Sequence, residues 1–133
     1  GYMSAWAVTQ SRRFMTAIVG AGVIDIGAAA LTTDVPTYAP GYFGDPVTHR
    51  AEYDAHSPIR YVDRVSAPVL ILHGEADARV PLSQGQMFYR ALKFHGTPVE
   101  MVTYPRGPHW FTEQAAGRDV QQRVLDWLDT HLR

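Results

Sequence analysis

The chain contains no cysteine among its 133 residues, and this absence removes several kinds of chemistry. Without cysteine there is no disulfide, no thiolate nucleophile and no zinc site built on thiolates. Long hydrophobic runs are missing as well, because the most apolar stretch, residues 17–24, is far shorter than the roughly 20 residues that span a bilayer. We therefore expect no membrane partner, and with no signal segment visible we expect a cytoplasmic location.

An excess of charge of either sign is also absent. The chain has 12 basic and 13 acidic residues and a net charge of −1, which gives no electrostatic footprint for nucleic acid. Its histidines form neither a His-x-His pair nor a His-Glu-x-x-His motif, so we expect no metal and no cofactor. Hydrophobic residues make up 46% of the chain, which is typical of one globular domain over residues 1–133.

The hydrophobic pattern predicts an alternation of helices and strands. Apolar runs bounded by glycine or proline predict three strands, at residues 16–20, 69–73 and 99–104. Helical periodicity predicts helices at residues 1–11, 83–95 and 118–132, with short helices near 27–33 and 50–56 and a helical turn starting at Ser57-Pro58. A strand–helix–strand unit is right-handed with parallel strands, so we expect an α/β fold with a three-stranded parallel sheet flanked by helices.

An acid and a histidine follow two of these strands. Asp77 lies four residues after the strand at 69–73, and His109 lies five residues after the strand at 99–104. Loops that leave parallel neighbouring strands emerge at the same edge of the sheet, so Asp77 and His109 are expected within hydrogen-bond distance. His73, at the end of the first of these strands, is interpreted as a structural histidine with satisfied hydrogen bonds.

In the chain, Asp77 comes before His109, and this matches the second half of the order Ser…Asp…His found in α/β-hydrolases. The nucleophile is the missing part. Glycines at −2 and +2 mark a nucleophile elbow, and they flank none of the five serines, Ser4, Ser11, Ser57, Ser66 and Ser83. Residues 1–6 look like the segment that follows an elbow, which would place the serine three residues before Gly1 and make the chain the C-terminal part of a hydrolase cut just past its nucleophile.

Several motifs together resemble the prolyl-oligopeptidase family of serine peptidases, particularly its acylaminoacyl-peptidase-like members. They are Gly-Tyr-Met at 1–3, Ser-Pro-Ile at 57–59, Ala-Pro-Val-Leu-Ile-Leu-His-Gly-Glu-Ala-Asp at 67–77, Arg-Val-Pro at 79–81, Phe-Tyr-Arg-Ala-Leu at 88–92, and Tyr104-Pro105 with His109. The resemblance implies the C-terminal half of an α/β-hydrolase domain and cleavage of peptide or acyl-amino-acid bonds. It assigns Asp77 as triad acid and His109 as triad base, and it suggests Val23 and Ile26 as lining of a substrate pocket.

One residue departs from the family pattern next to the base. Trp110 follows His109, at a position where the family usually has glycine. Tryptophan enters the left-handed region only at a cost in free energy, so this substitution predicts a different path for the histidine loop.

Two other functions remain open at this point. Besides the peptidase interpretation, one alternative is a non-catalytic α/β-hydrolase remnant that self-associates, and the other is part of a general carboxylic ester hydrolase. Residues 16–24 contain no proline and no charged residue that would protect a strand edge from pairing with another chain. We therefore expect a homodimer, or association with a missing N-terminal half.

Overall fold

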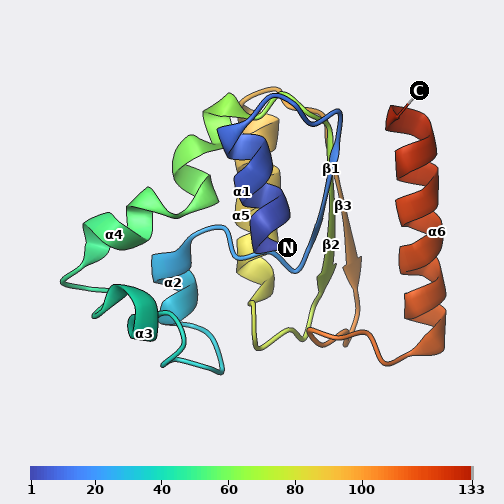
Figure 1. The fold of residues 1–133 in the computed structure, drawn as a ribbon. Coiled ribbons are helices and arrows are strands. Elements are labelled where there is room, and N and C mark those ends of the chain that lie inside the picture. The colour runs from blue at the N-terminus through green and yellow to red at the C-terminus, as the bar shows by residue number, and fades with distance from the viewer. Residues whose placement is uncertain (133) are drawn as a thin grey trace.

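The computed structural model describes residues 1–132 and shows a small parallel sheet with helices on both faces (Figure 1). Its elements, in chain order, are α1 (Tyr2–Gln10), β1 (Ala17–Gly20), α2 (Ile26–Ala30), α3 (Pro40–Phe43), α4 (Arg50–Ala55), the 3₁₀ helix η1 (Pro58–Arg64), β2 (Val69–Gly74), α5 (Leu82–Phe94), β3 (Val99–Tyr104) and α6 (Gln114–His131). Among residues 1–132, no helix combines the length and the apolar character needed to cross a membrane.

The sheet has the strand order β1-β2-β3, and both neighbouring pairs are parallel. Val69 of β2 pairs with Ala17 on one side and with Val99 on the other. All six residues of β2 are buried, as expected for a central parallel strand with covered faces. The predicted α/β class with a three-stranded parallel sheet is confirmed.

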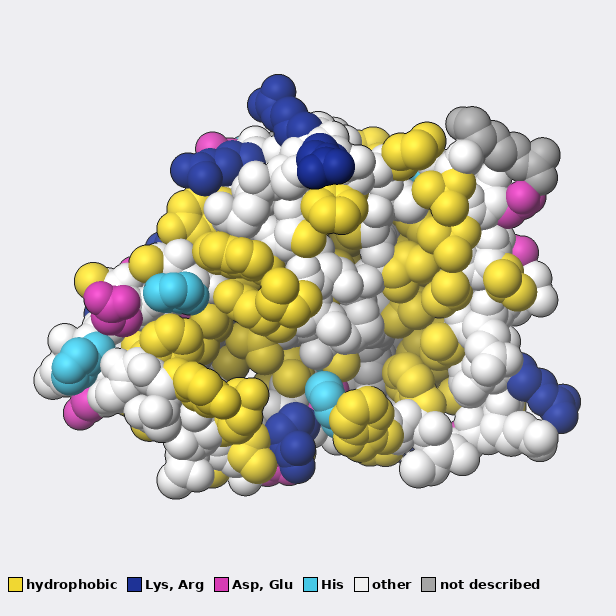
Figure 2. Space-filling view, in the orientation of Figure 1, with side chains coloured by type: hydrophobic (Ala, Val, Ile, Leu, Met, Phe, Trp, Pro, Cys, Tyr) yellow, Lys and Arg dark blue, Asp and Glu magenta, His cyan; other side chains and the backbone are white. Residues whose placement is uncertain are grey.

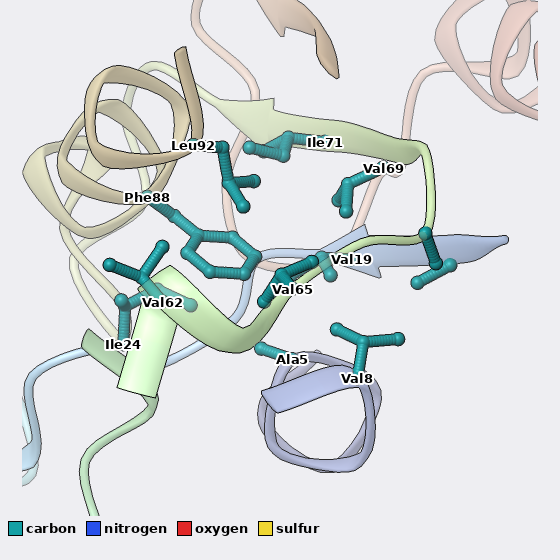
Figure 3. Packing of buried hydrophobic residues seen from close by; sticks show 12 residues of the cluster. Ala5, Val8, Val19, Ile24, Val62, Val65, Val69, Ile71, Phe88 and Leu92 are labelled. Carbon is teal, nitrogen blue, oxygen red and sulfur yellow. The ribbon is translucent and has the colours of Figure 1, made fainter. Parts of the chain in front are cut away.

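The main core lies between the sheet and the layer of α1, α5 and η1 (Figure 3). Val19 and Ile71 project from the strands toward α5, where Phe88 and Leu92 are fully buried. The same helical face begins one turn earlier with Gln84, which is also buried. Burying a side chain such as Phe88 stabilises the fold by about 2 kcal/mol, so this face of α5 fixes the helix against the sheet.

Helix α6 covers the opposite face of the sheet. Leu70 and Leu72 are the buried residues there, and α6 contributes partly buried side chains such as Val124. The indole N–H of Trp127 donates to Thr16 Oγ1 at 2.7 Å, and the Thr16 hydroxyl in turn donates to the Pro68 carbonyl at 2.8 Å. This chain of hydrogen bonds ties α6 to the start of β1.

Two elements differ from the sequence prediction. Helix α6 begins at Gln114 rather than at residue 118, because the good helix formers of residues 114–116 extend it upstream and Gly117 does not interrupt it. Helix α3 was not predicted, since its proline was interpreted as part of a turn. Pro40 instead occupies a first-turn position, where its missing N–H is not needed.

The outer edge of β1 has no neighbouring strand within residues 1–132. The amides of Ala17 and Ala21 donate to β2 and its entry, so those of Ile18 and Gly20 point to the open edge. Figure 2 shows this side of the molecule, with hydrophobic side chains gathered over α1 and between the sheet and α6. Met15, just before the strand, is 57% exposed.

We expect this open edge to drive self-association of the chain at micromolar concentration. A Gly20→Lys variant places a charge on the edge, where a Cβ meets no atom within 4 Å, and should shift the protein toward monomer. Gly41→Lys is the matched control, because Gly41 is equally open but lies in α3, away from the edge. Sedimentation velocity measures the effect, and a wild-type monomer of 14.8 kDa would contradict this prediction.

Candidate active site

The carboxylate of Asp77 is buried at the carboxyl end of the sheet, with no solvent exposure of its side chain. Its Oδ1 accepts a hydrogen bond from the Val80 amide at 2.8 Å, which closes the turn that follows β2. Its Oδ2 lies 2.8 Å from Nδ1 of His109. A buried carboxylate requires such partners, and each of its oxygens has one here.

His109 meets this carboxylate from the loop after β3, and its side chain is 21% exposed. Because a carboxylate accepts hydrogen bonds, Nδ1 carries the proton and Nε2 is the ring nitrogen available to take another. An acid that fixes the imidazole tautomer in this way is what a histidine base requires. The predicted contact between Asp77 and His109 is confirmed, 32 residues apart in the chain.

The two loops are brought together by the strand register and by one glycine. Gly74 pairs with Tyr104 at the ends of β2 and β3, and beyond them the Ala76 amide donates to the Gly107 carbonyl at 3.0 Å. A Cβ on Gly74 would overlap the carbonyl oxygen of Gly107. Only glycine at position 74 therefore permits the acid loop and the histidine loop to approach this closely.

Trp110 does not keep His109 from reaching Asp77. The left-handed residue of this loop is Arg106, with φ 59°, and Trp110 is not among the positive-φ residues of the described chain. The Trp110 ring instead stands edge-on to the His109 ring, with centroids 4.9 Å apart, and the Trp110 side chain is exposed. The left-handed turn lies upstream of the histidine, so the position after it does not need glycine.

A cavity of about 400 Å³ adjoins the acid turn. Val23 and Ile26 line it, at the positions suggested for a substrate pocket, and aromatic side chains including Tyr38 and Tyr42 form its outer wall. Val80, whose amide anchors Asp77, lines it as well. The cavity and the Asp77–His109 pair thus share the turn after β2.

Two buried polar side chains that sequence reasoning missed support the cavity wall. The Oε1 of Gln84 accepts the amides of Ile24 and Asp25, both at 2.8 Å. The Ser57 hydroxyl accepts the Ile26 amide at 2.9 Å. A signal for Gln84 was present in the sequence, because it lies one turn before Phe88 on the buried face of α5.

Tyr104, the last residue of β3, ties the start of the histidine loop to α6. Its hydroxyl donates to Asp119 at 2.9 Å, and Arg123 Nε donates to the same carboxylate oxygen at 2.7 Å. The ring of Phe111, two residues after His109, packs on Tyr104 with centroids 4.7 Å apart. Desolvation and the hydrogen bond to Asp119 raise the pKa of Tyr104 to about 12, while the bond from Arg123 lowers the pKa of Asp119.

No cluster of three or more histidine, aspartate or glutamate side chains able to hold a metal ion occurs within residues 1–132. The chemistry that the geometry offers is proton transfer by His109, supported by Asp77.

A parallel sheet that carries an acid and a histidine on consecutive loops at its carboxyl edge defines the second half of an α/β-hydrolase fold. The acylaminoacyl peptidase of Pyrococcus horikoshii has this fold, and its structure matches 98% of the chain with a TM-score of 0.88 at 28% sequence identity. The match covers 22% of that protein. The family model described as the prolyl oligopeptidase family matches residues 1–133, and the chain belongs to this family.

Relatives at the sequence level include two kinds of peptidase. The acylamino-acid-releasing enzyme of Rattus norvegicus is 33% identical over 99% of the chain, which covers 19% of that enzyme. Dipeptidyl-peptidase 5 of Porphyromonas endodontalis is 32% identical over the whole chain, which covers 20% of it. The chain thus spans about a fifth of the length of the relatives it matches.

A Gly74→Ala substitution should separate the acid and histidine loops, because the new methyl group overlaps the Gly107 carbonyl. We expect a loss of about 1–3 kcal/mol in the free energy of unfolding. We also expect loss of the downfield Nδ1–H proton signal of His109 in NMR spectra. Gly20→Ala is the matched control, since its Cβ meets nothing within 4 Å. A Gly74→Ala protein with both properties unchanged would contradict the argument.

The raised pKa of Tyr104 predicts a loss of stability at alkaline pH. A group whose pKa is higher in the folded state contributes stability below its unfolded pKa, here 10.0, and this stability is lost as the pH rises toward about 12. The free energy of unfolding should therefore fall across this window. Tyr104→Phe should flatten that part of the profile. Denaturant titrations at several alkaline pH values measure it, and Tyr38→Phe, at an exposed tyrosine, is the control.

Proposed function

We propose that this chain supplies the acid and the base of a Ser-Asp-His hydrolase that cleaves peptide or acyl-amino-acid bonds. The observation that carries the proposal is the 2.8 Å contact between buried Asp77 and partly exposed His109. Membership of the prolyl oligopeptidase family, with acylamino-acid-releasing and dipeptidyl-peptidase relatives, supports a serine peptidase. In this proposal the nucleophilic serine comes from polypeptide outside the 133 residues.

The reaction assigns each ring nitrogen of His109 a separate task. Nε2 takes the proton of the serine hydroxyl as its oxygen attacks the carbonyl carbon, while Nδ1–H stays bonded to Asp77, whose charge stabilises the imidazolium. The imidazolium then gives the proton to the leaving amine, and the acyl-serine ester forms. Water activated by the same Nε2 hydrolyses this ester and restores the serine.

The cavity beside the acid turn is proposed to receive the side chain that precedes the scissile bond. Its volume of about 400 Å³ is in the range of small-molecule pockets. Val23 and Ile26 line it, and the Arg79 head group at its margin is paired with Asp34 at 2.6 Å. The lining therefore favours an apolar side chain over an acidic one.

The open edge of β1 is the proposed contact with the nucleophile-bearing part. Its outward-facing amides, at Ile18 and Gly20, are able to pair with a neighbouring strand. Gly1 packs directly against the carbonyl of Gly20 at the end of this strand. Either an N-terminal half of the hydrolase or a second copy of the chain can form backbone hydrogen bonds with this edge of β1. The two occupants are mutually exclusive there.

A chimera tests the proposed roles. The chain replaces the segment that it matches in the Pyrococcus horikoshii acylaminoacyl peptidase, and hydrolysis of an acyl-amino-acid anilide is measured. We expect activity, with Asp77→Asn lowering kcat by about 10⁴-fold because the acid no longer fixes the tautomer of the base. His109→Ala should have an effect of similar size. His95→Ala, at an exposed histidine, is the matched control.

Besides an inactive chimera, three outcomes would contradict the proposal. The first is a folded chimera that keeps its activity after His109→Ala, and the second is hydrolysis of p-nitrophenyl esters without any hydrolysis of anilides, which would favour a general ester hydrolase. The third is stoichiometric labelling of Ser4 by a fluorophosphonate in the isolated chain, which would place the nucleophile inside it.

A further inference from the structure

His73, next to the last residue of β2, has a fully buried imidazole ring that the proposed reaction does not use. Its Nε2 lies 2.8 Å from the carbonyl oxygen of Val80, and this oxygen accepts a hydrogen bond, so Nε2 carries the proton. The Nδ1 atom has no hydrogen-bond partner in the described part of the chain. The sequence interpretation of a structural histidine with satisfied hydrogen bonds therefore holds for Nε2 but not for Nδ1.

The imidazole ring of His73 is packed tightly against α5. Gly85 of α5 lies directly over it, and a Cβ at this position would be 2.6 Å from Nδ1 and 3.0 Å from the Met101 methyl carbon. An unpaired nitrogen among such neighbours costs free energy, which an apolar side chain of the same size would not. Packing alone therefore does not explain a histidine at position 73, whereas the hydrogen bond from its N–H does.

That N–H acts on the turn that bears the proposed catalytic acid. Val80 is bound twice, because its carbonyl accepts from His73 and its amide donates to Asp77 Oδ1 at 2.8 Å. The same Nε2 lies 3.8 Å from Asp77 Oδ2, the oxygen that binds His109. The positive end of the N–H dipole thus faces the buried carboxylate as well as the Val80 carbonyl.

We propose that His73 is a positioning residue for Asp77, whose Nε2–H holds the Asp77–Val80 turn so that Oδ2 points at His109. This inference rests on the proposed function, because it takes Asp77 to be the acid of the reaction. Without the donor, the carbonyl of Val80 is buried and unpaired, and the turn must open to satisfy it. The carboxylate then no longer selects the Nδ1–H tautomer of His109.

A pair of nearly isosteric variants isolates the N–H group. His73→Gln keeps an N–H that reaches the place of Nε2, whereas His73→Met has similar size and shape without a donor. Both are made in the full chain, and His95→Gln is the control at an exposed site. The readouts are the Nδ1–H tautomer fraction of His109 from ¹⁵N shifts at alkaline pH and the hydrogen-exchange rate of the Val80 amide.

We expect the Met variant to lose the Nδ1–H preference of His109 and to exchange the Val80 amide about tenfold faster, as loss of one hydrogen bond implies. The Gln variant should restore both properties to near wild-type values. A Met variant that matches the wild type in both readouts overturns the proposal. So does a Gln variant that behaves like the Met variant while both remain folded.

A measurement on the wild-type chain decides the matter if a variant does not fold. The ¹⁵N shifts of His73 must show the Nε2–H tautomer, with slow exchange of that proton, and an Nδ1–H tautomer overturns the proposal. None of these readouts depends on hydrolysis. An inactive chimera would therefore count against the proposed function, and the NMR results would still decide the positioning role of His73.

Discussion

The buried carboxylate of Asp77 is the group on which the arrangement of the candidate site depends. A charge without solvent contact destabilises a fold unless polar groups surround it, and those groups come from separate segments. The Val80 amide comes from its own turn, the His109 ring from the loop after β3, and the His73 N–H from β2. The need to satisfy one carboxylate therefore fixes the relative placement of a strand and two loops.

Much of this arrangement was predictable from local sequence patterns. The strands at 69–73 and 99–104 are continuous apolar runs, and the helix between them makes them parallel neighbours. Parallel neighbours bring their carboxyl ends together, so topology alone predicts the pairing of Asp77 with His109. The cavity residue Ile26 was suggested only by family resemblance, because nothing in its local pattern marks a pocket.

The supporting hydrogen bonds were not predictable, and the reason is their range. Gln84 binds the amides of residues 24 and 25, about 60 positions away, and Ser57 binds the amide of Ile26, 31 positions away. The place of Gln84 on the buried face of α5 indicates that it is buried, but the local pattern does not indicate which distant amides it binds. For His73, the burial followed from its strand, but its hydrogen-bond partner depended on the path of the following turn.

The acid turn also joins the cavity to the Asp77–His109 pair. Val80 lines the cavity, its amide binds Asp77 and its carbonyl accepts from His73. A shift of this residue toward or away from the cavity therefore moves the carboxylate that orients His109. Because the His73 ring packs closely beneath Gly85, the turn is held from the side of the core. Val80 therefore contacts the cavity and at the same time holds the carboxylate that pairs with His109.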